Sequence, residues 1–437
     1  MFLLPKFLTS HKIHFFTYYL ENIFYVEECI LVKKLLCLFM LLTFLLSYTS
    51  VFASDSLYVW SSDVETSTVP TSTVINAQND NSLNLTCGSA VLIEQNTGIV
   101  LYDHNMHEQL RPASVTKVMT ILLIMEAIDN GSISLQDNVP CSENASSMGG
   151  SQIWLDPTET LTVDEMLKAI CVVSANDCCV AMAEYIAGSQ ELFVERMNAR
   201  AKELGMNDTT FKNCHGLDED GHVTSSYDIA LMSRELITKH PSITNYTTIW
   251  MDTLRDGKSQ LVNTNKLLRN YQGCTGLKTG STSTALFNLS ATATRDNLSL
   301  IAVVMKGETS QIRFAEAQKL LDYGFSNFEY YSCANTGDIL KDILVQKGTV
   351  KTVTVGFKHE TGVLIPKGQR GNITTTVILP DSVPAPINRG DKLGEVVFKL
   401  GDETLSTIDL ISTSTVKKIS FPNMLTHVFS KWFNLLR

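Results

Sequence analysis

Three short polar motifs constrain the fold of this chain, because they lie far apart in the sequence and each is chemically weak alone. They are Ser114-Val-Thr-Lys117, Ser174-Ala-Asn176 and Lys278-Thr-Gly280, in that order. Two similar matches, Ser142-Glu-Asn144 and Ser414-Thr-Val-Lys417, are attributed to chance. If the three motifs act together, the fold must bring a helix start, a loop between helices and a strand to one cleft. We predict such a fold.

The first two motifs have roles that follow from their chemistry. A serine hydroxyl needs a nearby base, so Ser114 is the predicted nucleophile and Lys117, on the same helix face, its base. Lys117 must then lose its proton, and we expect burial and the charge of Lys278 to lower its pKa. Ser174 can relay a proton to the leaving amine, while Asn176 holds the substrate backbone. The alternative for Ser174 or Asn176 is a helix N-cap.

The third motif is predicted to begin an edge strand of the cleft. Lys278 can attract a substrate carboxylate, Thr279 can hydrogen-bond it, and Gly280 permits close approach of the backbone. The backbone N–H groups of Ser114 and Ser281 are the predicted oxyanion hole. In isolation, a Lys-Thr-Gly sequence would more often be a turn.

Hydrophobic periodicity predicts a mixed α/β catalytic domain over residues 86–325. A β-hairpin is expected around Asn96-Thr-Gly98, between the apolar runs at 89–94 and 99–102. Strands are expected at 285–294 and 298–305, and helices at 114–130, 162–171, 175–187, 190–204, 226–239 and 311–323. Short alternating runs with Gly- and Pro-bearing turns then predict a small β domain over 326–412.

Residues 413–437 are predicted to form an amphipathic helix. Apolar side chains such as Phe421, Phe429 and Trp432 fall on one stripe, polar ones occupy the other side, and no acidic residue follows Asp409. A helix of this kind lies in an anionic membrane interface. The alternative is a helix docked on its own domain.

The N-terminus has the pattern of an export signal. Lys33-Lys34 precede the apolar run Leu35–Leu46, and Val51-Phe52-Ala53 supplies small residues at a cleavage site. We expect residues 1–53 to be an upstream extension and signal peptide, followed by a Ser/Thr-rich spacer at 54–85. The alternative is an uncleaved anchor. The protein is thus predicted to be secreted across the cytoplasmic membrane and held on its outer face.

Charge and cysteine spacing exclude other classes. The formal net charge is −10 and no long basic run is present, so no nucleic-acid partner is expected. The ten cysteines show no repeated C-x-x-C or Cys/His spacing of the zinc type. We therefore predict no metal site and no cofactor.

The motifs and their surroundings resemble those of the serine D-alanyl-D-alanine carboxypeptidases, the low-molecular-mass penicillin-binding proteins. The resemblance covers roughly 86–412, and the segments that carry it are Arg111-Pro-Ala-Ser-Val-Thr-Lys-Val-Met-Thr, Val173-Ser-Ala-Asn-Asp, Phe193-Val-Glu-Arg-Met-Asn, His215-Gly-Leu-Asp and Asp322-Tyr-Gly-Phe. It implies a β-lactamase-like domain with an antiparallel sheet between helices, and a peripheral membrane anchor at the C-terminus. It also implies that Ser114 releases the terminal D-alanine of peptidoglycan pentapeptides through an acyl-enzyme, which penicillins trap.

The resemblance extends to single residues. It implies that Arg313, on the turn after the 298–305 strand, binds the terminal carboxylate of the substrate; a solvated arginine at a helix start is the alternative. Asp228 is expected to order a loop near the site. Two positions depart from the family: Leu286 stands where relatives commonly carry Gly, and Cys214 where Pro is common. Both put the rate and the substrate preference in doubt, not the reaction class.

Other functions remain open at this point. A class A β-lactamase needs a positioned Glu for deacylation, and no Glu-x-x-Leu-Asn segment lies between Asn176 and Lys278. A non-catalytic peptidoglycan-binding protein would not need the nucleophilic groups. A transpeptidase or endopeptidase would use the same acyl-enzyme, and the sequence does not distinguish the acceptor, the oligomeric state, or a vegetative from a sporulation role.

Overall fold

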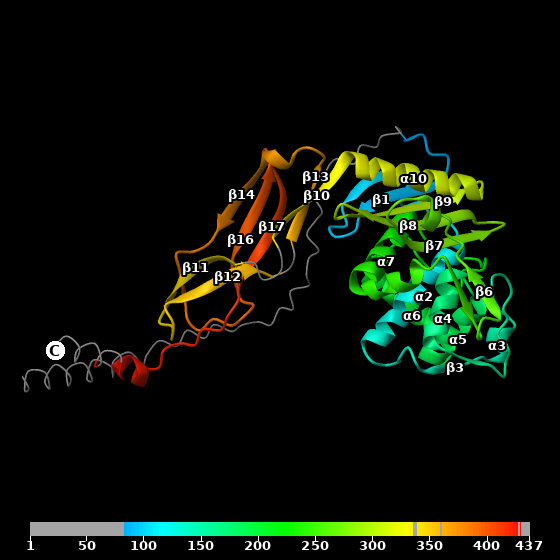
Figure 1. Ribbon diagram of the computed structural model, residues 1–437, viewed down its shortest axis with the longest axis horizontal. Helices are drawn as coiled ribbons and strands as arrows, with labels where there is room; N and C mark the ends of the chain where they lie inside the picture. The colour runs from blue at the N-terminus through cyan, green and yellow to red at the C-terminus, as the bar shows by residue number, and fades with distance from the viewer. Residues whose placement is uncertain (1–82, 335–338, 359–360, 427–428, 430–437) are drawn as a thin grey trace, which may run out of the picture. The chain divides into compact units, whose positions relative to one another are not determined.

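The computed structural model describes residues 83–334, 339–358, 361–426 and 429, so the predicted signal segment lies outside the described part. The catalytic part is built on a five-stranded antiparallel sheet with the strand order β2-β1-β9-β8-β7 (Figure 1). Its strands are β1 (Ser89–Glu94), β2 (Val100–His104), β7 (Cys274–Thr282), β8 (Leu286–Arg295) and β9 (Leu298–Gly307).

Alternation of side chains along the strands gives the sheet two buried faces. Ala90 and Leu92 of β1 point to the core shared with α10 (Ser310–Asn327), whereas Val91 and Ile93 point to the larger core among the other helices. A strand buried on both faces reads as a continuous apolar run, because neighbouring side chains project to opposite sides. The predicted antiparallel sheet between helices is confirmed.

The helices on the second face hold the first two motifs. They are α2 (Lys117–Asp129), α4 (Val163–Val172), α5 (Asn176–Ala187), α6 (Gln190–Glu203) and α7 (Ser226–Lys239). A capping box of Thr162 and Glu165 starts α4, and Gly188 ends α5 with φ +87°. The smaller elements are α3 (Glu143–Ser146), α8 (Thr244–Thr247), α9 (Leu267–Asn270), β3 (Asn138–Pro140), β4 (Thr160–Thr162), β5 (Met251–Leu254) and β6 (Ser259–Val262).

Residues after α10 form a separate set of strands with their own core, which includes Val355, Ile365 and Leu410. The strands are β10 (Phe328–Ala334), β11 (Ile339–Gln346), β12 (Thr352–Phe357), β13 (Thr361–Pro366), β14 (Ile373–Ile378), β15 (Ser382–Pro384), β16 (Lys392–Leu400) and β17 (Glu403–Ser412). β10 pairs with β13, and the other six form one sheet. The region after residue 325 is therefore rich in β-strands, as predicted.

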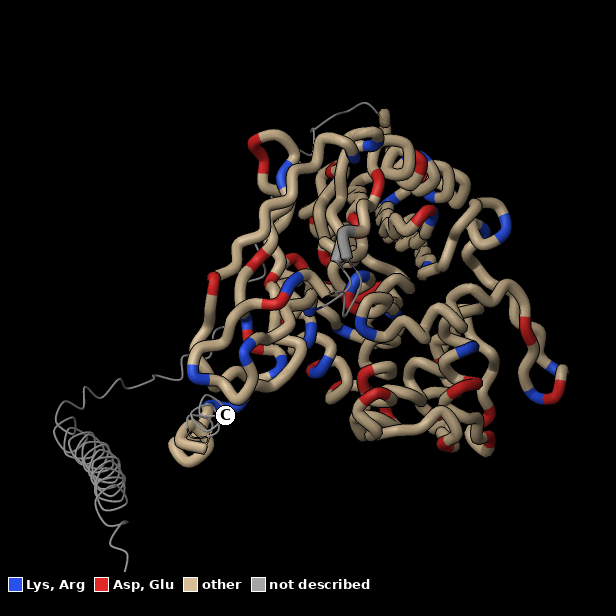
Figure 2. The backbone as a smooth tube through the Cα atoms, turned by 60° about the vertical axis from the view of Figure 1, so that its left-hand side comes forward, with Lys and Arg blue, Asp and Glu red and all other residues tan. Residues whose placement is uncertain are grey.

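The surface carries both signs of charge. Figure 2 shows acidic and basic residues mixed along the described chain, without a continuous basic stripe. Within the described residues, no helix has both the length and the apolar character needed to cross a membrane.

Candidate active site

Ser114 lies in a 3₁₀ turn, Ala113–Thr116, that leads directly into α2. Ala113 has a φ of +48°, a left-handed conformation that residues other than glycine rarely adopt. The hydroxyl of Thr116 donates to the carbonyl of Ala113 over 2.8 Å and so holds this turn. Strained backbone of this kind persists only where surrounding contacts fix it, and it is common at functional sites. The turn fixes the position of Ser114 just before the N-terminus of α2.

Lys117 is fully buried and faces Ser114. Its Nζ lies 3.0 Å from Ser114 Oγ, 2.6 Å from Asn176 Oδ1 and 2.6 Å from the carbonyl oxygen of His215. Burial disfavours the ammonium form and lowers the pKa of Lys117. The geometry and the lowered pKa both suit a general base for Ser114.

The second motif lies between α4 and α5, on the opposite wall. Asn176 is the first residue of α5; its N–H donates to Ser151 O over 2.7 Å and its Nδ2 to Gly149 O over 2.6 Å. Ser174 has φ +67°, and among the described residues its buried Oγ has no hydrogen-bond partner. A buried hydroxyl without a partner is costly, which is consistent with a group kept for substrate or for proton transfer. The alternative N-cap role is not observed for either residue.

The third motif lies in the middle of the edge strand β7 rather than at its beginning. Lys278 is 1% exposed, and burial together with repulsion from Lys117 lowers its pKa to about 7. Its Nζ donates to Thr279 O over 2.9 Å, and the hydroxyl of Thr279 bonds that of Thr264 over 2.6 Å. β7 therefore brings an ammonium and a hydroxyl to the same cleft as Ser114 and Lys117.

Gly280 lets β7 approach the nucleophile. A Cβ at this position would lie 2.8 Å from the backbone nitrogens of both Ser114 and Val115. Only glycine fits so close an approach. The next residue, Ser281, is exposed on the strand. The predicted oxyanion-hole residues, Ser114 and Ser281, thus belong to adjoining backbone segments.

Histidine does not supply the base. His215 is 6% exposed, and burial lowers its pKa to about 3, so its ring is only a weak base. Its Nδ1 accepts a hydrogen bond from the N–H of Leu217 over 3.2 Å. Among the described residues, no carboxylate hydrogen-bonds to Ser114 or Lys117. Lys117 is therefore the basic group positioned to act on Ser114.

Comparison with known proteins agrees with this geometry. Residues 74–309 match the D-alanyl-D-alanine carboxypeptidase family, and residues 328–418 match the C-terminal domain of penicillin-binding protein 5. The chain is 44% identical to D-alanyl-D-alanine carboxypeptidase DacF of Bacillus subtilis over 79% of this chain and 89% of the relative. The chain belongs to the D-alanyl-D-alanine carboxypeptidase family. The predicted enzyme class, a serine-type carboxypeptidase of cell-wall metabolism, is confirmed.

Solved structures of penicillin-binding proteins match the fold of this carboxypeptidase. Penicillin-binding protein 5 from Haemophilus influenzae is 31% identical and matches with a TM-score of 0.68, over 76% of this chain and 98% of its own. Penicillin-binding protein D2 from Listeria monocytogenes, solved in the ampicillin-bound form, is 32% identical with a TM-score of 0.51, over 55% of this chain and 98% of its own. The predicted fold is confirmed.

Arg313 lies in the first turn of α10, not on the preceding turn of the chain. It is 7% exposed, and its Nη1 donates to Gly280 O over 3.1 Å and to Asn288 O over 3.2 Å. The guanidinium also stacks over the rings of Phe287 and Phe314. In this arrangement Arg313 supports β7 through its hydrogen bond to the carbonyl of Gly280. Its contact with a substrate carboxylate stays a prediction.

The two departures from the family occupy defined positions in the carboxypeptidase. Leu286 has φ +57°, a left-handed conformation in which glycine is favoured, so a leucine here is strained. Cys214 is buried, its thiol lies 3.6 Å from Gln190 Oε1, and its carbonyl accepts a bond from Thr120 over 2.6 Å. Leu286 thus begins β8 in a strained conformation, whereas Cys214 is a core residue.

Three supporting residues were not predicted as site residues. The carbonyl of His215 fixes Lys117, Thr264 fixes Thr279, and Asp177 holds the segment that touches Asn176. For His215 and Asp177, the only sequence feature that could have identified them is that they lie in segments that resemble the family. No sequence feature identified Thr264.

Asp228 orders a loop, as expected. Its Oδ2 accepts bonds from Asp208 N over 2.8 Å and from Thr209 Oγ1 over 2.7 Å.

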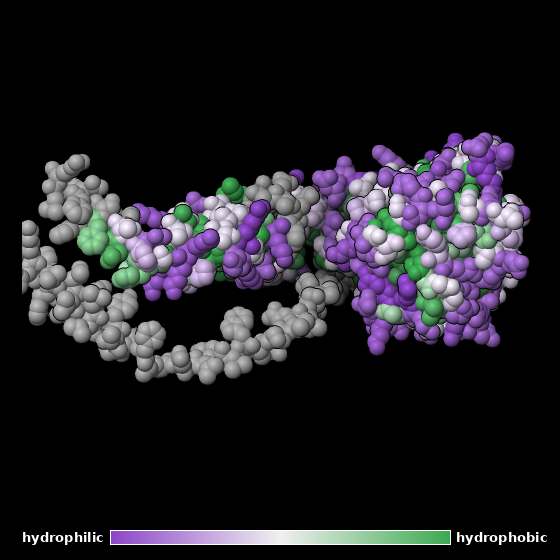
Figure 3. All heavy atoms as spheres, turned by 90° about the horizontal axis from the view of Figure 1, so that it is seen from below, coloured by the Kyte–Doolittle hydropathy of each residue, from purple (hydrophilic) through white to green (hydrophobic). Residues whose placement is uncertain are grey.

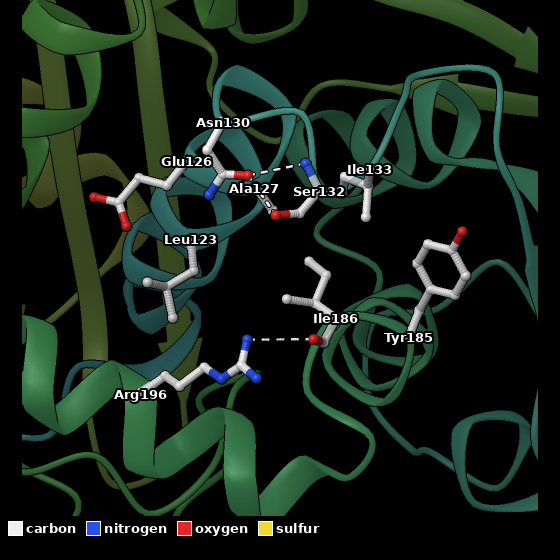
Figure 4. Close-up of a pocket in the computed structure, with 9 residues that line it drawn as sticks. All are labelled: Leu123, Glu126, Ala127, Asn130, Ser132, Ile133, Tyr185, Ile186 and Arg196. Carbon is white, nitrogen blue, oxygen red and sulfur yellow. Dashed lines mark hydrogen bonds between the residues drawn. The ribbon is translucent and has the colours of Figure 1, made fainter.

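A pocket lies apart from the three motifs. It has a volume of about 590 Å³ and lies among the C-terminal parts of α2 and α5 and the helix α6 (Figure 4). Tyr185 and Arg196 line it, and Arg196 donates to the carbonyl of Ile186 over 3.2 Å. None of the motif residues lines this pocket. Within the described residues, no group of His, Cys, Asp or Glu side chains is arranged to hold a metal ion.

Proposed function

We propose that this protein removes the terminal D-alanine from peptidoglycan pentapeptides through an acyl-enzyme on Ser114. The observation that carries the proposal is the 3.0 Å contact between Ser114 Oγ and the buried Nζ of Lys117. Neutral Lys117 takes the hydroxyl proton as Oγ attacks the carbonyl of the penultimate D-alanine. The backbone N–H groups of Ser114 and Ser281 stabilise the oxyanion.

The second half of the reaction uses the opposite wall. As the tetrahedral intermediate collapses, the C–N bond breaks and Ser174 passes the proton from Lys117 to the leaving amine, which departs as D-alanine. Water then attacks the ester and gives a proton to Lys117; the bond between the acyl carbon and Ser114 Oγ breaks, and Lys117 returns the proton to Oγ. The unpartnered Oγ of Ser174 and its place beside Asn176 support this relay.

Substrate recognition is assigned to the β7 strand. The ammonium of Lys278 attracts the terminal carboxylate, Thr279 hydrogen-bonds it, and Gly280 lets the substrate backbone lie close to Ser114. Arg313 contributes positive charge from behind the strand. β-Lactams that mimic the dipeptide are proposed to acylate Ser114, and the ampicillin-bound relative supports this.

The test uses a soluble form spanning residues 54–412. We expect it to release D-alanine from a peptide ending in D-Ala-D-Ala, and penicillin to block this release. Mass spectrometry should place the penicilloyl group on the peptide that contains Ser114. Acylation without D-alanine release would instead indicate a transpeptidase that lacks its acceptor. Absence of both from a folded protein would leave only a binding role.

We further propose that the protein is exported and held on the outer face of the cytoplasmic membrane. Lys33-Lys34 and the apolar run Leu35–Leu46 support export, and N-terminal sequencing of the exported protein tests cleavage before Ser54. The C-terminal end supports attachment. The helix predicted from residue 413 begins only at Phe421, because Val416 and Lys418 form β-bridges to Ile387 and Gly348. Residues 421–426 are helical, with Phe421, Met424 and Leu425 at least 41% exposed, and this end of the described chain appears as an apolar group in Figure 3.

Attachment predicts lipid-dependent sedimentation. The protein from Ser54 to Arg437 is expected to sediment with vesicles that contain anionic lipid, because an apolar stripe and basic residues act together. Removal of residues 413–437 should leave it in the supernatant. Leu425→Ser with Phe429→Ser should also release it, whereas Asn423→Ser with Ser430→Ala, on the polar side, should not. Equal sedimentation of all forms would contradict the proposal.

A further inference from the structure

Trp154 presents an exposed indole between two buried neighbours. Its side chain is 76% exposed, whereas its neighbours Ile153 and Leu155 are 5% and 4% exposed. Residues 149–159, here called the Trp154 segment, form neither helix nor strand. Tryptophan combines a large apolar face with a polar N–H, and it is enriched where proteins meet ligands and partners.

The backbone of the segment is strained, and hydrogen bonds to both its N–H and its carbonyl groups fix it. Trp154 has φ +54°, which costs energy for a residue with a side chain. The buried carboxylate of Asp177 accepts the N–H groups of Ile153 over 3.0 Å and of Leu155 over 3.1 Å. Arg255 donates to the carbonyls of Ile153 over 2.9 Å and of Trp154 over 3.3 Å.

Arg255 is itself fixed. Its Nε and Nη2 donate to the two carboxylate oxygens of Glu159 over 2.6 and 2.7 Å. Bidentate pairs of this kind are strong and directional. The backbone that carries the indole is therefore held in a defined place, and little loop entropy remains to be lost on binding.

The same segment forms the wall of the active site. Gly149 and Ser151 accept hydrogen bonds from Asn176, which in turn contacts Lys117. At Gly150, an added Cβ would lie 2.8 Å from Asn176 Nδ2, so the segment fits closely against the motif. Trp154 follows Ser151 by three residues, which span at most about 10 Å. The indole thus lies near the catalytic groups but outside them.

We propose that Trp154 is a stacking platform for a pyranose ring in the glycan part of the substrate. This inference rests on the proposed function, in which the substrate is a peptide carried by a glycan. Four extended residues separate that ring from the attacked carbonyl, a span of roughly 13 Å. The negative face of an indole attracts the C–H groups of a neutral ring.

The face of the indole is open to a ligand. Trp250, the other tryptophan in the described part of the chain, is covered by the guanidinium of Arg269 at 5.3 Å, whereas no cation of the described residues covers Trp154. Glu159 is paired with Arg255, and the exposed carboxylate of Asp156 accepts hydrogen bonds from Thr158. Gln152, half-buried on the same segment, carries an amide that suits sugar hydroxyls.

The test compares two substrates of the exported protein, residues 54–437. One is a pentapeptide ending in D-Ala-D-Ala, and the other is the same peptide joined to N-acetylmuramic acid. Trp154→Ala is expected to lower the ratio of kcat/KM for the sugar-bearing over the sugar-free peptide by roughly five- to tenfold, mainly through KM. Trp154→Phe should retain most of the ratio, because it keeps an aromatic face.

Controls separate the possible outcomes. Leu192→Ala removes an exposed apolar side chain of α6 and should leave the ratio unchanged. An equal loss on both peptides, or no loss, would overturn the proposal. A loss that follows a free side-chain amine of the peptide, and disappears when that amine is acetylated, would overturn it in favour of cation binding. If wild-type protein hydrolyses neither peptide, the proposed function itself has failed.

Discussion

A Lys117→Met protein is expected to acylate with penicillin at least ~10⁴-fold more slowly than wild type, although Ser114 is intact. The amine that lies 3.0 Å from Ser114 Oγ is lost, and among the described residues no histidine or carboxylate side chain hydrogen-bonds to that hydroxyl. Stopped-flow acylation measures the rate. Because Ser114 and Lys117 act as a unit, Ser114→Ala with Lys117→Met should be no worse than Ser114→Ala alone.

The pH dependence of acylation by the wild-type protein tests the same role of Lys117 without a substitution. Acylation should rise with pH as Lys117 loses its proton, since only the neutral amine accepts one, and burial sets this limb below the ordinary lysine range. Binding of a carboxylate needs protonated Lys278, so it should fall as pH rises through about 7. The two lysines titrate as a coupled pair, which gives a bell-shaped profile.

Lys319→Met is the matched variant, because Lys319 is an exposed lysine of α10. It should keep both the rate and the profile. A Lys117→Met protein that acylates within tenfold of wild type, or a wild-type profile without an acid limb, would show that another group takes the proton from Ser114.

The helices and strands were predictable because their periods are local. The continuous apolar run of β1 and the capping signals of α4 are each written in a few neighbouring residues. The three motifs were also predictable, since the residue types needed for a nucleophile, a base and a carboxylate partner limit the choice. Their order then implied one cleft, and the structure brings Ser114, Lys117 and Asn176 within hydrogen-bonding reach.

What the sequence did not reveal depends on contacts between distant segments. The carbonyl of His215 that fixes Lys117 is a backbone atom, which no side-chain pattern identifies. The partners of Arg313 are the backbone carbonyls of Gly280 and Asn288, which lie on other strands and which no side-chain pattern identifies. The exposure of Trp154 likewise follows from a strained backbone held by Asp177 and Arg255, far apart in the chain.

Gly216→Ala is expected to remove both stability and activity, although Gly216 carries no chemistry. Its φ is +91°, and an added Cβ would lie 2.0 Å from Ala113 O and 2.9 Å from Ser114 N. These atoms belong to the strained turn that presents the nucleophile, so the clash must displace Ser114 from Lys117. We expect acylation to fall by at least ~10³-fold and the free energy of unfolding by about 3 kcal/mol or more.

Gly205→Ala separates the clash from the cost of the backbone conformation. Gly205 also has a positive φ, +73°, but an added Cβ there meets no heavy atom within 4 Å. This control should cost only about 1 kcal/mol and leave acylation unchanged. Thermal melts and penicillin acylation of the two variants measure the difference. If both behave alike, the close approach of Gly216 to the nucleophile turn is wrong; if only Gly216→Ala fails, the His215-Gly216 segment sets the position of Ser114.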